Sequence, residues 1–301
     1  MKFFACLVLT LSLFLNECSQ GVQDISSNTA SAQIFPISQL SQTSPIQNMK
    51  QSLEEPLKIT KPSEVFEIKG ISAKLTEKEK NSIDKWKLEI TQTISNNQGT
   101  AFLNGNTPKK LVALTFDDGP DQVVTPKILD ILKHNQVHGN FFFIGSSVKL
   151  FPSVVKKAYD EGNLVLSHGF EHSNFTNKTE SFICDEFNNT NNAICSIIGK
   201  TPVIVRPPYG IINENVLNAA KSQGYKLVIW STDTFDWSQK DKSNIVDNVI
   251  NNVRPGEIIL MHSNGDKIST AEALPLIIEG LQEKGYTIVT LDLLLNTNAY
   301  K

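Results

Sequence analysis

The sequence predicts an α/β fold: a distorted (β/α) barrel of about seven parallel strands, preceded by a disordered linker and a helix. From residue 110 onward, short apolar runs alternate with segments of helical periodicity, and this alternation implies a parallel sheet. Polar residues follow directly on the ends of five of these runs. Because the carboxyl ends of parallel strands converge on one face of a barrel, this second observation favours a barrel over an open sheet.

The first residues have the pattern of an export signal. Lys2 supplies a positive charge, and Phe3–Leu15 form an uncharged, mostly apolar run. A helix of that length reaches only about 20 Å, against a hydrocarbon core of roughly 30 Å, so cleavage fits better than permanent spanning. We therefore expect residues 1–18 to be a signal peptide and the mature protein to be extracytoplasmic, either secreted or membrane-anchored.

Cys18 stands where bacterial lipoproteins carry the lipidated cysteine that tethers them to a membrane. Processing sites of that kind favour small residues before the cysteine, whereas Asn16 and Glu17 precede it here. The sequence leaves open both lipidation at Cys18 and ordinary cleavage nearby.

Two segments of different character precede the barrel. Residues 19–64 are rich in Ser, Thr, Gln, Asn and Pro and lack sustained apolar periodicity, which predicts a low-complexity linker. Residues 65–109 form a helical lead-in, in which Thr76 and Glu79 are a capping pair and apolar residues recur at helical spacing. Such a helix could pack on the following domain or serve as a stalk.

The main domain is expected over residues 110–301. Seven apolar runs are its strand candidates: Leu111–Phe116, Asn140–Ile144, Leu164–Ser167, Val203–Val205, Leu227–Trp230, Ile258–Met261 and Thr287–Leu291. Four intervening segments have clear helical periodicity: Pro126–His134, Pro152–Asp160, Glu214–Gln223 and Ala273–Lys284.

Two cysteines remain in the main domain, since Cys6 would leave with the signal. Cys184 and Cys195 lie in Ser181–Ile198, which is expected to be helical and would separate them by about 16 Å along its axis. Bridged cysteines need Cα atoms within about 7 Å. We favour two reduced core cysteines over a disulfide, which would require a break in that helix.

Composition limits the function classes. A hydrophobic content of 40% is enough for a buried core. The formal net charge of −3 gives no electrostatic reason to expect a nucleic-acid partner, whose phosphates attract concentrated positive charge.

Two adjacent carboxylates, Asp117 and Asp118, end the first strand candidate and precede a Gly-Pro turn. Adjacent side chains in extended structure diverge, so one carboxylate can bind a metal while the other handles protons. Considered alone, the segment could equally be a surface turn.

His168 and His172 follow another strand candidate at a spacing of four. From a helical turn or a tight loop, two such histidines can reach one cation, and a carboxylate would complete a three-ligand site with an open position. This spacing by itself is often coincidence, but the chain has only five histidines.

Three further segments supply polar groups at strand ends. In Arg206–Gly210 two prolines stiffen the loop, which holds the arginine in place and leaves the Tyr209 amide available. In Asp233–Trp237 and Leu260–His262 a carboxylate can stand beside a histidine and favour its protonated form, which a general acid needs. Buried structural pairs of that kind are at least as common.

Taken together and in this order, the five segments resemble the polysaccharide deacetylases of carbohydrate esterase family four, the NodB homology domain. The resemblance runs from about Lys110 to Leu295. Thr115–Pro120, read as TFDDGP, and Arg206–Gly210, read as RPPYG, match the first and third motifs of that family without change.

The remaining motifs also match, with two departures. His168 and His172 match the histidines of the second motif, and the last two segments fit the Asp-x-x-Asp-Trp and Leu-x-His motifs. Gly169 stands where that family usually has Ser or Thr, which removes a hydroxyl able to brace the loop, although the ligands survive. Ser263 stands where many relatives have aspartate, which we interpret as tolerated variation.

The resemblance implies a metal site and two proton-transfer groups. Asp118, His168 and His172 would bind a divalent metal ion, most often Zn²⁺, with Co²⁺, Ni²⁺ and Mn²⁺ as alternatives. Asp117 would be the general base and His262 the general acid. Two further residues would support them: Arg206, which orients Asp117, and Asp236, which tunes His262.

The resemblance also implies how substrate is held. Trp237 and Leu260 would line the pocket that receives the acetyl methyl group. Tyr209 would contribute its backbone N–H to the oxyanion, and Pro207 and Pro208 belong to the same substrate-binding side.

The implied reaction is removal of N-acetyl groups from a cell-surface polysaccharide, such as peptidoglycan, a chitin-like chain or an exopolysaccharide, with release of acetate. One alternative is an O-acetyl esterase acting on acetylated xylan or a similar glycan. Another is an inactive glycan-binding module, whose usual sign is loss of a ligand or of the base. The expected partner is the polysaccharide itself, with a membrane tether through Cys18 left open and no nucleic acid.

Overall fold

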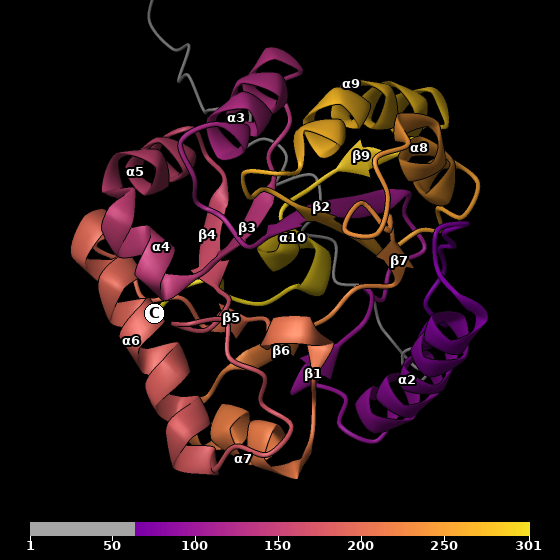
Figure 1. Ribbon diagram of the computed structural model, residues 1–301. Coiled ribbons are helices and arrows are strands. Elements are labelled where there is room, and N and C mark those ends of the chain that lie inside the picture. Colours follow the sequence, from indigo (N-terminus) through magenta and orange to yellow (C-terminus); the bar gives the residue numbers. More distant parts are fainter. Residues whose placement is uncertain (1–63) are drawn as a thin grey trace, which may run out of the picture. The chain divides into compact units, whose positions relative to one another are not determined.

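The computed structural model describes residues 64–301, which lie in one compact unit (Figure 1). The predictions of a signal peptide over residues 1–18, of lipidation at Cys18 and of a linker up to residue 63 lie outside the described residues. Within the described part, no helix is long and apolar enough to cross a membrane.

A parallel sheet of nine strands organises the chain, in the order β1-β6-β5-β4-β3-β2-β8-β7, with β9 also paired to β2. The ladder ends at β1 and β7, and no strand pairing within residues 64–301 joins these ends. The predicted distorted α/β barrel is therefore confirmed. The strands are β1 (Ala101–Phe102), β2 (Leu111–Asp117), β3 (Asn140–Phe143), β4 (Leu164–Ser167), β5 (Ile204–Val205), β6 (Lys226–Val228), β7 (Thr232–Asp233), β8 (Glu257–His262) and β9 (Thr287–Ile288).

Helices surround this sheet (Figure 1). They are α2 (Glu77–Ser95), α3 (Val124–His134), α4 (Gly145–Leu150), α5 (Pro152–Asp160), α6 (Glu180–Ile198), α7 (Glu214–Gln223), α8 (Lys242–Ile250), α9 (Ile268–Glu283) and α10 (Leu291–Leu295), with one 3₁₀ turn, η1 (Pro208–Gly210).

The seven strand candidates correspond to β2 to β6, β8 and β9, and every helical segment expected from periodicity is present. Five further elements had not been expected: strands β1 and β7 and helices α4, α8 and α10. These two strands consist of Ala-Phe and Thr-Asp, and they lack the run of β-branched residues that marks the equally short β5 and β9.

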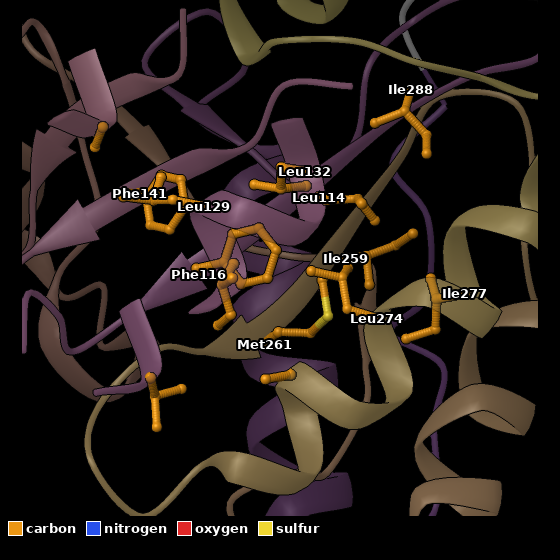
Figure 2. Packing of buried hydrophobic residues seen from close by; sticks show 14 of the residues in the cluster. Leu114, Phe116, Leu129, Leu132, Phe141, Ile259, Met261, Leu274, Ile277 and Ile288 are labelled. Atoms are coloured by element: carbon orange, nitrogen blue, oxygen red, sulfur yellow. The ribbon is translucent and has the colours of Figure 1, made fainter. Parts of the chain in front are cut away.

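Alternate residues of β2 face the two sides of the sheet, as the period of two in a strand requires. Leu114 and Phe116 pack outward against the helices, together with Ile259 and Met261 of β8 (Figure 2). The intervening residues of both strands face the barrel interior. The register pairs Asp117 with His262, so the strand ends carrying these two residues finish at the same level.

The lead-in segment packs on the barrel. The predicted capping box is present at the start of α2, where Thr76 and Glu79 bond each other's backbone N–H. Ile90 and Ile94 on this helix are buried, and β1 pairs with β6. Upstream of α2, Lys69 bridges to Thr232 of β7. These contacts make residues 64–109 part of the packed unit and not a free stalk.

Helix α6 runs unbroken through both cysteines of the main domain. The Thr179 side chain caps its first turn, and Gly199, in the left-handed conformation, ends it. The predicted helix is confirmed, and Cys184 and Cys195 are free thiols on it. The expected core position is wrong, because both side chains are only partly buried.

Candidate active site

Polar residues from five strand ends gather at the carboxyl face of the barrel. Asp117 ends β2, His168 follows β4, Arg206 follows β5, Asp233 ends β7 and His262 ends β8. The parallel topology brings them together although Asp117 and His262, the two furthest apart in the chain, are separated by 145 positions. This is the face on which barrel folds place their chemistry.

Asp118, His168 and His172 form the one cluster of potential metal ligands within residues 64–301, with ligand atoms all within 4.8 Å of one another. Asp118 Oδ1 lies 3.5 Å from His168 Nε2 and 3.2 Å from His172 Nε2. This buried oxygen makes no hydrogen bond in the described chain. Three ligand atoms that converge without bonding each other are suited to a cation between them.

The surroundings of His168 leave it neutral and able to coordinate. Its Nδ1 lies 2.8 Å from the Arg206 carbonyl oxygen, which can only accept, so Nδ1 carries the proton and Nε2 has a free lone pair. Burial lowers the pKa of His168 to about 3, despite the nearby carboxylate of Asp118.

The backbone is strained at this face. Asp118, His172, Tyr209 and Phe235 all have positive φ, between 53° and 70°. Non-glycine residues adopt this region rarely, and such conformations cluster where the surrounding structure holds a functional side chain in place.

Asp117, only 2% exposed, is held by Arg206. Arg206 Nη1 donates to Asp117 Oδ1 at 2.7 Å. Burial raises the pKa of the Asp117 carboxyl, and the guanidinium charge opposes that rise. The result is a carboxylate that accepts a proton more readily than an exposed aspartate, with one oxygen fixed and the other, Oδ2, 3.6 Å from His168 Nε2.

Arg206 is fully buried and each guanidinium nitrogen has a partner. Nε donates to the Val228 carbonyl and Nη2 to that of Ile229, both at 2.9 Å, while Nη1 also donates to Thr115 Oγ1 at 2.9 Å. Its guanidinium carbon lies 4.0 Å from the centre of the Phe142 ring, a cation–π distance. The arginine is thereby fixed in orientation before any substrate arrives.

On the other side of the site, His262 is paired with Asp236. His262 Nδ1 lies 2.7 Å from Asp236 Oδ1, and the His262 backbone N–H donates to Oδ2 at 2.8 Å. Thr270 Oγ1 donates to the same Oδ2 at 2.6 Å. Burial favours a lower pKa for His262, but the charge and hydrogen bond of Asp236 outweigh it and raise the pKa to about 9. His262 is therefore protonated at neutral pH.

The residues expected to bind substrate lie at the rim and in the wall of this face. Trp237 is 43% exposed, and its Nε1 donates to Asp233 Oδ1 at 3.2 Å. Leu260 is buried and faces inward with His262. Tyr209 is 57% exposed, with its ring centre 4.6 Å from that of His172. Pro207 and Pro208, which precede it in the chain, are buried.

A groove of about 490 Å³ adjoins Trp237. The first turns of α2 and the residue before them, Leu75, form its other wall. It offers room beside the site for more than a single acetyl group.

Three residues that contact the site were given no role by the sequence analysis, although Thr115 belongs to the TFDDGP motif. Thr115 and Thr270 bond Arg206 and Asp236, and Glu186 accepts from the backbone between the two histidines. The sequence contained an indication for Glu186, because a carboxylate on the apolar face of a helix, here beside Ile183, needs a specific partner.

Known proteins are similar to this chain in sequence and in fold. Residues 104–228 match the sequence profile of the family described as polysaccharide deacetylase. The peptidoglycan-N-acetylmuramic acid deacetylase PdaA of Bacillus subtilis (strain 168) is 40% identical over 196 residues, 64% of this chain and 74% of that protein.

Two solved structures have the same fold. The Bc1960 peptidoglycan N-acetylglucosamine deacetylase superposes with a TM-score of 0.67 at 36% identity, over 69% of this chain and 98% of that one. BA3943 of Bacillus anthracis, described as a CE4 family pseudoenzyme, gives a TM-score of 0.62 at 28% identity, over 66% and 70% of the chains.

Proposed function

Since this chain belongs to the polysaccharide deacetylase family, we propose that it is a metal-dependent N-deacetylase of a cell-surface polysaccharide. One observation carries the proposal: Asp117 and His262, register partners at the ends of β2 and β8, lie beside a cluster of three metal-ligand side chains. Each is held by its own buried, oppositely charged partner. Hydrolysis of an acetamide requires such a base, such an acid and an electrophile.

The donor set suits a divalent cation, most often Zn²⁺, with Co²⁺, Ni²⁺ and Mn²⁺ as alternatives. Asp118, His168 and His172 would hold it. Once bound, it would polarise the acetyl carbonyl and lower the pKa of the attacking water.

Asp117 is proposed as the general base. Its pKa is raised by burial, so it accepts the proton of the attacking water more readily than an exposed aspartate would. Arg206 keeps the carboxylate ionised before the reaction and fixes its orientation. The tetrahedral oxyanion that follows would accept a hydrogen bond from the backbone N–H of Tyr209.

His262 is proposed as the general acid. With a pKa of about 9 it is protonated at neutral pH, and Asp236 bonds its Nδ1, which leaves Nε2–H to protonate the departing amine. This step separates acetate from a free amino sugar. An alkoxide leaving group depends less on such protonation, so the paired His262 should accelerate amide cleavage more than ester cleavage.

Binding of a polymer has support at the rim. Trp237 and Leu260 would hold the acetyl methyl group, with Pro207 and Pro208 in the loop beside them. The groove between Trp237 and α2 would take neighbouring sugars of the chain. Because relatives at 39–40% identity are named peptidoglycan deacetylases, we propose peptidoglycan as the first polymer to test and an extracytoplasmic site of action.

Mass spectrometry of defined oligosaccharides tests the proposal. The protein, supplied with Zn²⁺, is incubated with N-acetylglucosamine oligomers, with peptidoglycan fragments and with acetylated xylan. We expect loss of acetyl groups from an N-acetylated glycan. Release from xylan alone would establish the O-acetyl esterase alternative, and binding without release would establish the inactive module.

A further inference from the structure

The loop between His168 and His172 is bonded from two sides. On one side, the backbone N–H of Gly145, at the start of α4, donates to the Gly169 carbonyl at 2.9 Å. The next N–H of α4, that of Ser146, donates to the Phe170 carbonyl at 2.9 Å. These bonds hold the carbonyl groups of the loop.

On the other side, one buried carboxylate holds the loop N–H groups. Glu186 Oε2 accepts from the backbone N–H of Phe170 at 3.0 Å and from that of Glu171 at 3.1 Å. These are two of the three residues between the candidate ligands. Glu186 is only 7% exposed and comes from α6, a rigid element.

The buried position of the Glu186 carboxylate is unfavourable unless hydrogen bonds compensate for its lost hydration. It lies on the buried face of α6, beside Ile183 and Phe187, and burying a carboxylate there carries a large desolvation penalty. Bonds from two backbone N–H groups compensate that penalty, and charge-assisted bonds of this kind are stronger than neutral ones.

Residue 169 is glycine and has no side chain that could replace the hydrogen bonds made by Glu186. Gly169 has a φ of +77°, in the region that favours glycine, and a Cβ there would lie 3.4 Å from Glu186 Oε2. The tight turn therefore brings the Phe170 and Glu171 amides directly onto the Glu186 carboxylate.

We propose that Glu186 is a positioning residue of the metal site. By fixing the backbone at Phe170 and Glu171, it sets the separation and orientation of the His168 and His172 imidazoles. The inference rests on the metal site of the proposed function. It concerns the residue that orients the ligands, and Glu186 is not itself proposed as a ligand.

Zn²⁺ affinity of the purified, metal-free protein tests this, measured by competition with a chromophoric chelator. Glu186→Leu removes the acceptor of the Phe170 and Glu171 N–H groups. It should weaken Zn²⁺ binding about 10- to 100-fold, the range for residues that orient metal ligands. Glu186→Gln keeps an acceptor and should lose less. Asp185→Asn removes an exposed charge from the adjacent position of α6 and should bind as the wild type does.

A second readout separates positioning from general stability. Zn²⁺ should raise the Tm of wild type and of Asp185→Asn strongly, and that of Glu186→Leu much less, because the gain follows affinity. A purely structural residue would lower Tm equally with and without metal.

A Zn²⁺ affinity within twofold of wild type in Glu186→Leu overturns the inference. If that variant is insoluble, the same result in Glu186→Gln overturns it, since loss of the charged acceptor should still weaken binding severalfold. A wild-type protein that binds no divalent metal would instead overturn the proposed metal site itself.

Discussion

Replacing Asp236 by asparagine tests whether His262 acts as a protonated acid. Asp236 Oδ1 lies 2.7 Å from His262 Nδ1, and its other oxygen accepts from Thr270. Asparagine keeps the size of the side chain but removes the charge. Burial alone favours a lower pKa for His262, and Asp236 is the largest influence that raises it to about 9.

The size of the effect follows from the protonated fraction. Without the carboxylate, the pKa of His262 should fall to its ordinary value of about 6.5 or below, because burial remains. At pH 8 the protonated fraction would drop from about 0.9 to about 0.03, which predicts a roughly 30-fold loss of kcat/KM. Near pH 6 most of the histidine is protonated in both proteins, so the loss there should be small.

The raised pKa of His262 determines on which side of the pH profile activity is lost. An acid with a raised pKa stays active to higher pH, so wild-type activity should fall only as pH rises through about 9. In Asp236→Asn the same fall should occur near pH 6.5 or below. The assay is kcat/KM on an N-acetylated oligosaccharide from about pH 5 to pH 10, with the same metal for both enzymes.

Asp233→Asn is the matched control. Asp233 accepts a hydrogen bond from Trp237 and none from His262, although the two charges interact. Its loss can lower activity but should move the alkaline limb much less than Asp236→Asn does. Its own pKa is raised by burial to about 6, which affects only the acid side of the profile. The reasoning is refuted if Asp236→Asn lowers activity by one factor at every pH while the alkaline limb stays near pH 9.

Three further outcomes are expected. His168→Ala should lose most bound metal by elemental analysis, whereas Asp117→Asn should keep a full equivalent and lose turnover; full metal content in the first variant would contradict the ligand assignment. His262→Ala should lose about 10²- to 10⁴-fold in kcat/KM on an N-acetyl sugar and less on an activated acetate ester, and equal losses would contradict its assignment as the acid. A chain without residues 1–63 should stay soluble and active, whereas removal of residues 1–100 should yield insoluble or inactive protein, because it strips α2 from the barrel; solubility and turnover measure both.

The sequence predicted the strands that have a pattern of their own. β2 spans seven residues with alternating inward and outward positions, and β8 spans six. Strands β1 and β7 lack a β-branched run of their own and exist because neighbours offer backbone partners: β6 for β1, and both β8 and Lys69 for β7. Such strands arise from tertiary pairing, which no local window of sequence contains.

The residues of the candidate site likewise fall into those that the sequence predicts and those that depend on tertiary contacts. Motif residues at strand ends could be identified, because a polar group directly after an apolar run is visible along the chain. Thr270 could not, since its function depends on reaching Asp236, 34 positions away in sequence. Glu186 was visible only as a carboxylate on the apolar face of a predicted helix, and the sequence does not show that its partners are the amides of Phe170 and Glu171.

Helix α2 of the lead-in segment contacts the loop that begins at Arg206, through aromatic side chains. Trp86 of α2 lies 5.4 Å from Trp230, whose ring centre is 5.5 Å from the Arg206 guanidinium. A Cβ on Gly210 would lie 2.8 Å from Trp86 and 2.9 Å from Trp230, so both rings pack directly on the loop that begins at Arg206. Because Arg206 orients Asp117 only while it is itself held, α2 supports the proposed general base from outside residues 104–228, the part of the chain that matches the family profile. Truncation of this helix should therefore reduce turnover even in a chain that still folds.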